Sequence, residues 1–234
     1  MPVARVLFDT LSRDRLLKAT VWLSAAFIAV SAVFVLIPQI DLAVSRAFFT
    51  PDVGFETKGL WYERLIHRSV GVLLVLGNMA LLVLWRSKRF ANPGVVTLRG
   101  KELVFLLVFL ALGPGLIVNG LLKESWGRAR PAQILQFGGN RDFTPAFVLS
   151  DQEGKSFSSG HAAASFYWIV VALLIAPRPK WWTYLAAAYC LIVSWMRIAA
   201  GGHFLSDVLT SIFVMALLAL AMYGAAYERR EPAS

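Results

Sequence analysis

The chain contains long runs of apolar residues that carry no charged side chain, separated by polar stretches. A helix that crosses a bilayer needs roughly 20 mostly apolar residues, with a range of about 17–25. A buried helix of a soluble protein rarely stays apolar on every face over such a length. We therefore predict an all-α fold, a polytopic membrane helix bundle with six transmembrane helices. The six runs are Ala19–Ile37, Ser69–Trp85 (with a helix start as early as Leu65), Leu103–Leu122, Ala162–Ala176, Trp181–Met196 and Val208–Tyr227.

Composition supports the membrane class. Of the 234 residues, 58% are hydrophobic and 16% are charged, whereas a soluble domain has about 45–50% apolar and about 25% charged residues. The apolar content excludes disorder, and the single Cys190 excludes a disulfide framework. The net charge of +9 comes from basic residues that flank the apolar runs. We therefore expect the bilayer, and no nucleic acid, as the partner, and we leave the oligomeric state open.

Lys and Arg concentrate in segments that alternating helices would place on one side of the membrane. Cytoplasmic loops carry the excess of Lys and Arg, so both termini are expected in the cytoplasm. The loops of the opposite side mix acidic and basic residues. The cytoplasmic set is Arg5, Arg13, Arg15, Lys18, Arg86, Lys88, Arg89, Arg99, Lys101, Arg178, Lys180, Arg229 and Arg230; the opposite set is Asp41, Asp52, Glu56, Glu63, Arg46, Lys58 and Arg64.

These boundaries divide the chain into three parts. Residues 1–18 form a basic amphipathic N-terminal segment, residues 19–227 form the six-helix transmembrane domain, and residues 228–234 form a cytoplasmic tail. Apolar residues recur near helical spacing in the first part. Such a segment is either a helix lying in the membrane interface or a frayed basic tail that only sets orientation.

The threading brings polar residues that are distant in the sequence to the non-cytoplasmic ends of the last four helices. Ionisable residues at membrane depth indicate a functional site. The residues at this face are Lys123, Arg128, Arg130, Ser158, Ser159, Gly160, His161, Arg197, His203 and Asp207.

Several of these residues suit a phosphate group. Lys123, Arg130 and Arg197 are cations, and arginine matches phosphate oxygens with two parallel hydrogen bonds. Residues 158–160 lead into the fourth helix, and a helix N-terminus with its free N–H groups favours an anion. A glycine there lets the backbone approach a ligand closely.

Two histidines supply the remaining chemistry of phosphoryl transfer, a nucleophile and a proton donor. Asp207 follows His203 by four residues, a spacing that brings side chains together on a helical turn. A carboxylate there would fix the imidazole tautomer. Each residue alone has an ordinary structural explanation, such as a snorkelling cation or a helix N-cap; the combination favours an active site.

Three motifs carry a resemblance to a known family. KESWGRARP runs from Lys123 to Pro131, SSGH ends at His161, and MRIAAGGHFLSD runs from Met196 to Asp207. Together they resemble the signature of the type 2 phosphatidic acid phosphatases, with nine specified positions in the right order. The motifs cover residues 123–207 and say little about residues 1–100.

The resemblance implies a metal-independent phosphoric monoester hydrolase that needs no cofactor. It implies that His203 is the nucleophile that forms a phosphohistidine, that Asp207 orients it, and that His161 acts first as an acid and then as a base. The sequence itself lacks a convincing ligand set for a metal. The phosphate oxygens would be bound by Lys123, Arg130, Ser159, Gly160 and Arg197.

Two positions depart from the family pattern. Ser158 stands where the family has proline, which frees a backbone N–H and loosens the loop. Met196 stands where the family has serine, which removes one hydroxyl that could bind phosphate. Neither departure removes a reactive group, so they bear on rate and substrate choice.

The expected substrate is a lipid phosphate, because the site lies at the bilayer boundary. The segment 132–155 looks more like bacterial lipid A phosphatases than like generic members, which favours removal of a 4′- or 1-phosphate, with a weak preference for the 4′-position. The expected location is the cell inner membrane with the site facing the periplasm. Alternatively, the segment is a structural lid without selectivity. Candidate selectivity residues are Arg128, Phe137, Arg141, Phe143, Phe147 and Lys155.

Other functions remain open at this stage. The substrate could instead be undecaprenyl diphosphate or phosphatidylglycerol phosphate, or the phosphoryl group could pass to another lipid. A more distant alternative is an anion transporter, which fits an interruption of the third helix at residues 113–115 but leaves the two histidines unexplained.

Overall fold

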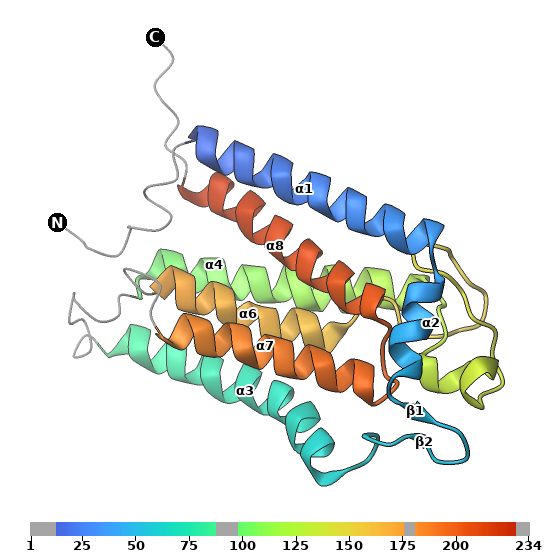
Figure 1. Cartoon of the computed structure of the whole chain (residues 1–234). Helices are drawn as coiled ribbons and strands as arrows, with labels where there is room; N and C mark the ends of the chain where they lie inside the picture. The colour runs from blue at the N-terminus through green and yellow to red at the C-terminus, as the bar shows by residue number, and fades with distance from the viewer. Residues whose placement is uncertain (1–12, 88–97, 176–180, 228–234) are drawn as a thin grey trace.

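The computed structural model describes residues 13–87, 98–175 and 181–227, and within them it is a bundle of long helices (Figure 1). Five helices are long and apolar enough to cross a membrane, and a sixth apolar helix is shorter. The predicted all-α membrane class is confirmed, whereas the exact count of six spans stays a prediction. The helices are α1 (Arg13–Leu36), α3 (Trp61–Arg86), the continuous α4–η2–α5 (Gly100–Leu110, Ala111–Leu122 and Lys123–Ser125), α6 (Gly160–Ile175), α7 (Trp181–Ala199) and α8 (Leu205–Tyr227).

Small elements lie at one end of the bundle, beside the loops that follow α5 (Figure 1). There α2 (Gln39–Arg46) precedes an antiparallel pair of short strands, β1 (Phe49–Thr50) and β2 (Gly54–Phe55). Short 3₁₀ turns η3 (Pro131–Gln133) and η4 (Leu135–Phe137) follow α5. The apolar pattern alone did not predict these elements, because each is shorter than one membrane span.

The first helix begins earlier than the apolar run suggests. Its described part begins at Arg13, so residues 13–18 of the expected N-terminal segment belong to a membrane helix. Nothing between Arg13 and Pro38 breaks a helix, and Asp14 in the first turn favours its positive end. Residues 1–12 and the tail 228–234 lie outside the described residues.

The third apolar run is not interrupted at residues 113–115, contrary to the expectation. Residues 111–122 instead form a wider π-helix around Pro114. Proline lacks the N–H of a regular helix, and π-type turns accommodate such a change. The side-chain amide of Asn119 donates to the carbonyl of Pro114 at 2.6 Å. The helix therefore continues to Lys123.

Helix α6 occupies the interior of the bundle and packs against α3, α4, η2, α7 and α8. Its first half consists largely of small buried residues, among them Ala162, Ala163 and Ala164. Small side chains let neighbouring helix backbones approach closely. This packing holds the N-terminus of α6, with His161, inside the bundle.

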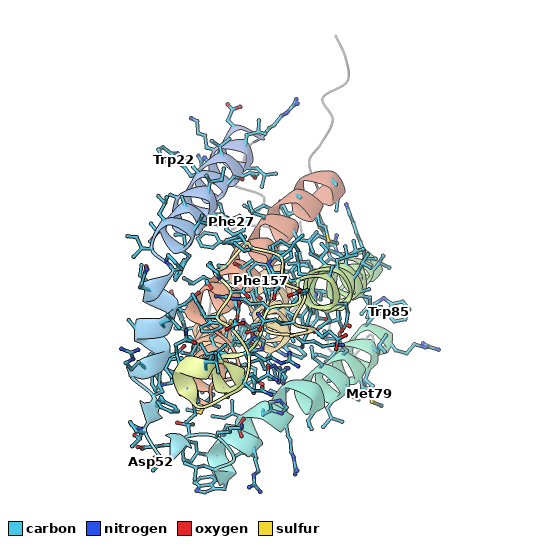
Figure 2. All side chains as sticks on the ribbon, turned by 90° about the vertical axis from the view of Figure 1, so that its right-hand side faces the viewer. Trp22, Phe27, Asp52, Met79, Trp85 and Phe157 are labelled. Carbon is cyan, nitrogen blue, oxygen red and sulfur yellow. The ribbon has the colours of Figure 1, made fainter. Side chains whose placement is uncertain are left out.

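The outer surface of the bundle is apolar, as a lipid-facing surface requires. Trp22, Met79 and Trp85 are exposed, whereas Phe157 is buried, and Figure 2 shows the first three around the outside with Phe157 near the centre. Figure 1 places the starts of α1, α4 and α7 at the same end as the ends of α3, α6 and α8. This alternation agrees with the threading inferred from the charges.

The contact between α3 and α6 yields a stability prediction. A Cβ on Gly77 would lie 2.1 Å from the ring of Trp168, whereas a Cβ on Gly71 of the same helix meets nothing within 4 Å. We expect Gly77→Ala to destabilise the protein by about 1–3 kcal/mol through overpacking. Thermal unfolding of the purified protein in detergent measures this, with Gly71→Ala as the matched control. Equal melting temperatures for the two variants would contradict the packing described.

Candidate active site

A buried arginine ties three parts of the chain together beneath the site. Arg128 is fully buried, and its guanidinium contacts Asp207 at 2.6 Å and Asp41 at 2.8 Å. It also donates to the Ser206 hydroxyl at 2.9 Å and to the Thr144 carbonyl at 2.9 Å. Each guanidinium nitrogen of Arg128 thus bonds to a partner inside the protein, which favours a structural role, and the expected role of Arg128 in substrate selectivity stays a prediction.

Asp41, which the sequence reasoning missed, belongs to this buried network. It comes from α2 and accepts hydrogen bonds from the backbone N–H and the hydroxyl of Ser206, at 3.0 and 2.5 Å. The only sequence signal was a carboxylate in a short polar stretch between apolar runs. Its contacts attach α2 to the first turn of α8, which carries Asp207.

His203 lies in the tight turn between α7 and α8. The backbone N–H groups of Gly202 and His203 both donate to the carbonyl of Arg197, at 2.9 and 3.1 Å. Gly201 has a φ of +64°, a left-handed conformation that glycine adopts without strain. The turn therefore reverses the chain within a few residues and fixes His203 beside the last turn of α7.

The ring of His203 is oriented by a backbone carbonyl. Its Nδ1 lies 2.7 Å from the carbonyl oxygen of Ser156. A carbonyl only accepts hydrogen bonds, so Nδ1 carries the proton and Nε2 keeps its lone pair. Asp207 approaches Nδ1 only to 3.8 Å, which is too long for a hydrogen bond.

Asp207 acts on His203 through its neighbours. One carboxylate oxygen accepts from the Ser156 hydroxyl at 2.6 Å and from the Phe204 N–H at 2.8 Å. The carboxylate thus fixes Ser156, whose carbonyl orients the ring, and Phe204, which directly follows His203 in the chain. The spacing of four residues correctly placed the two side chains close together, but it could not identify Ser156, which is distant in the sequence.

Burial keeps His203 uncharged. The side chain is only 1% exposed, and burial lowers the pKa of its imidazole to about 4, with Arg197 and Arg130 acting in the same direction. The carboxylate of Asp207 opposes this shift. At neutral pH the ring is therefore neutral, the form that a nucleophilic nitrogen requires.

The expected cations converge on this histidine. Arg130 and Arg197 both act electrostatically on His203 and on Lys123. Arg197 is largely buried and lies 3.6 Å from Glu63 of α3. Its Nε is buried and bonds to no atom of the described chain. An oxygen of a bound phosphate would satisfy this donor.

The N-terminus of α6 is built around Gly160. A Cβ at this position would lie 2.4 Å from the side-chain oxygen of Asn119, so a larger residue would displace that amide. The same oxygen accepts from Lys123 at 3.4 Å. Ser159 is fully buried, and its hydroxyl accepts the Ala162 N–H at 3.4 Å. Asn119 was missed by sequence reasoning because it lies inside an apolar run.

His161 follows in the first turn of α6, where Arg197, His203 and Lys123 all lie close enough to act on it electrostatically. Its ring also packs on that of His67 from α3, with centroids 4.2 Å apart. The motifs do not include His67 or Glu63, so only the helix packing reveals that α3 forms a wall of the site.

The three aromatic residues named as selectivity candidates pack against other rings of the protein. Phe137 is buried against Phe49 and Phe55, with ring centroids 5.1 and 5.4 Å away. Phe143 and Phe147 are half-buried and pack on other rings as well. This packing favours a structural role for the three rings, and their expected role in substrate selectivity stays a prediction.

The two remaining selectivity candidates differ from each other. Lys155 is exposed and pairs with Glu124 at 2.6 Å, so it is accessible but occupied. Arg141 is half-buried, and its Nη1 bonds to no atom of the described chain. Their role in selectivity stays a prediction.

Known proteins resemble the chain over most of its length. A family model described as the PAP2 superfamily matches residues 102–231. The lipid A 4′-phosphatase of Francisella tularensis subsp. novicida (strain U112) is 29% identical over 85% of this chain and 91% of its own length. Proteins of the same name from Rhizobium leguminosarum and Rhizobium etli are 33% and 32% identical, each over 81% of this chain and over 90% and 82% of their own lengths.

A solved structure shares the fold. The PAP2 type phosphatidylglycerolphosphate phosphatase from Bacillus subtilis superposes with a TM-score of 0.57, 21% identity, and coverage of 88% of this chain and 94% of its own. The match extends the likeness to residues before the motifs. Helix packing, motifs and family match agree, and the chain belongs to the PAP2 superfamily.

Proposed function

We propose that this multi-pass membrane protein is a lipid phosphatase that removes the 4′-phosphate of lipid A through a phosphohistidine intermediate. The observation that carries the chemistry is the hydrogen bond from His203 Nδ1 to the Ser156 carbonyl. It leaves Nε2 free beside Arg130 and Arg197. The substrate assignment is supported by three relatives named lipid A 4′-phosphatase, which align with 81–85% of the chain.

In the first step, the lone pair of His203 Nε2 attacks phosphorus while the bond from phosphorus to the lipid oxygen breaks. His161 gives a proton to that leaving oxygen. Lys123, Arg130, Arg197 and the N–H groups at the start of α6 stabilise the charge on the phosphate oxygens. Phosphoryl transfer depends mainly on such positioning and charge stabilisation.

In the second step, His161 has lost its proton and acts as the base for water. The water oxygen bonds to phosphorus as the phosphorus–nitrogen bond breaks, which releases inorganic phosphate and restores neutral His203. The Ser156 carbonyl keeps the Nδ1 proton in place throughout. The imidazolium character that develops on His203 is stabilised by the nearby Asp207 carboxylate.

The proposed location is the inner membrane, with both termini in the cytoplasm and the site facing the periplasm. Two observations support this orientation. The helix ends next to the most basic segments lie together, and the candidate site lies at the other end of the bundle (Figure 1). Cytoplasmic segments are the ones that carry an excess of Lys and Arg.

The first prediction from the proposed function concerns the two catalytic histidines. We expect His203→Ala to lower lipid phosphatase activity by at least about 10³-fold, because it removes the nucleophile. His161→Ala should lower activity by about 10²–10⁴-fold, because it removes acid–base catalysis. Phosphate release from purified, detergent-solubilised variants measures both effects, with elution volume and melting temperature as controls for folding.

A substrate with a good leaving group separates the two roles. A nitrophenyl phosphate ester needs little protonation on departure, so His161→Ala should still release a burst of nitrophenol from it. His203→Ala should release none. Near-normal phosphate release by either variant, or a burst from His203→Ala, would contradict the assignment.

The second prediction concerns the charge of His203. Because its pKa is lowered to about 4 from an ordinary value of 6.5, the ring should stay neutral as pH falls from about 7.5 to about 5.5. Nitrogen NMR of protein labelled at its three histidines should show the Nδ1–H tautomer throughout this range. Removing each histidine in turn assigns the signals, and a protonation midpoint near 6.5 for His203 would contradict the prediction.

The third prediction concerns the substrate. Mass spectrometry of total lipids from Gram-negative cells that express the protein should show lipid A with one phosphate fewer, and fragmentation should place the remaining phosphate at the 1-position. Cells with His203→Ala at equal abundance are the control. Release from undecaprenyl diphosphate or phosphatidylglycerol phosphate, with lipid A unchanged, would replace the proposed substrate. A labelled phosphoryl group that appears on another lipid would indicate transfer instead of hydrolysis.

A further inference from the structure

A cationic cavity extends outward from the two arginines of the phosphate site. Its volume is about 590 Å³, within the range of about 300–1,000 Å³ typical of ligand pockets. It shares Arg130 and Arg197 with the phosphate site and extends along the start of α3 and the loop before it. A group attached to a phosphate held by these two arginines would therefore enter this cavity.

The cavity carries more positive charge than one phosphate requires. Besides the two shared arginines, three cations line it: Lys58, Arg64 and Arg68. In the described part of the chain, none of the three forms an ion pair with a carboxylate. The one carboxylate in the lining belongs to Glu63, and it already lies beside Arg197.

Helix geometry places two of these cations next to the site. Arg64 and Arg68 are one turn apart on α3, which is about 6 Å along the helix axis. Each directly follows a residue that contacts the site: Glu63 faces Arg197, and His67 packs on His161. The two guanidiniums therefore extend the wall of the phosphate site outward.

Their place in the membrane topology is also unusual. Lys and Arg are enriched in cytoplasmic loops, yet these cations lie at the end of the bundle that holds the candidate site. Topology therefore does not explain them. Recognition of an anion does, because guanidinium groups match phosphate oxygens.

We propose that Arg64 and Arg68, aided by Lys58, bind a second phosphate monoester on the same lipid molecule, the one that is not hydrolysed. This inference rests on the proposed function, since lipid A carries phosphates at both its 1- and 4′-positions. The first phosphate lies between Arg130 and Arg197, and the sugar backbone spans the cavity to the second. The protein thus selects doubly phosphorylated substrate.

The test compares two lipids of identical acylation in uncharged detergent micelles: lipid A with both phosphates, and lipid A with the 4′-phosphate alone. We expect the wild-type kcat/KM to be about 10–100-fold higher for the first, as charge-assisted hydrogen bonds to one phosphate provide. Arg64→Gln with Arg68→Gln should bring this ratio close to one, mainly through a higher KM for the doubly phosphorylated lipid. Arg64→Lys with Arg68→Lys should retain part of the preference.

Arg46→Gln is the matched control, because Arg46 is an exposed cation at the end of α2 that does not line the cavity. It should keep the wild-type ratio. Equal wild-type rates on the two lipids, or an equal loss of preference in Arg46→Gln, would overturn the second-phosphate site while leaving the proposed function intact. Release from neither lipid would overturn the proposed function itself.

A last experiment distinguishes whether Arg64 and Arg68 bind a second phosphate of the substrate or the headgroup of a neighbouring membrane lipid. The singly phosphorylated lipid is assayed in vesicles with and without anionic phosphatidylglycerol. We expect the wild-type kcat/KM to change less than two-fold with vesicle charge. A large stimulation that disappears in the Arg64→Gln, Arg68→Gln variant would assign these arginines to membrane lipids and overturn the proposal.

Discussion

The buried contact of Arg128 with two carboxylates is the interaction on which the arrangement of the site depends. A charge removed from water is costly unless it is paired and hydrogen-bonded, and Arg128 meets this condition with Asp41, Asp207, Ser206 and Thr144. Removing one partner from such a pair typically costs about 3–5 kcal/mol. The cost keeps α2, the loop after α5 and the start of α8 in one relative position.

The two buried arginines of this site have different roles: one stabilises the structure and the other is available to bind phosphate. Each nitrogen of the Arg128 guanidinium bonds to an internal partner, and this arginine holds the surrounding segments together. Arg197 keeps a buried Nε without an internal partner in the described chain and lies beside the nucleophile. Both are buried guanidiniums, so residue type and burial alone do not distinguish them. Only the count of satisfied donors shows which arginine is free to bind a phosphate oxygen.

The sequence predicted the features that depend on local composition and on the order of elements along the chain. Apolar run length predicted the long helices, and alternation of those helices predicted that Lys123, His161, Arg197 and His203 gather at one end. It was uninformative where a contact depends on tertiary packing. Ser156 orients His203 through a main-chain carbonyl, which any residue provides, so no side-chain pattern can reveal it. Likewise, His67 meets His161 only because α3 packs against α6.

The π-helical stretch before Lys123 has a consequence for how this chain tolerates changes in length. An α-helix has about 3.6 residues per turn, whereas the twelve residues of η2 wind more slowly about the axis. The direction in which the Lys123 side chain points from its helix therefore depends on whether this stretch is α-helical or π-helical, as well as on its number of residues. Loss of one residue from this stretch would leave its span of the bilayer almost unchanged but rotate the ammonium group away from Arg130 and Arg197, whose charges act on it in the site. Register, more than hydrophobic thickness, constrains this segment.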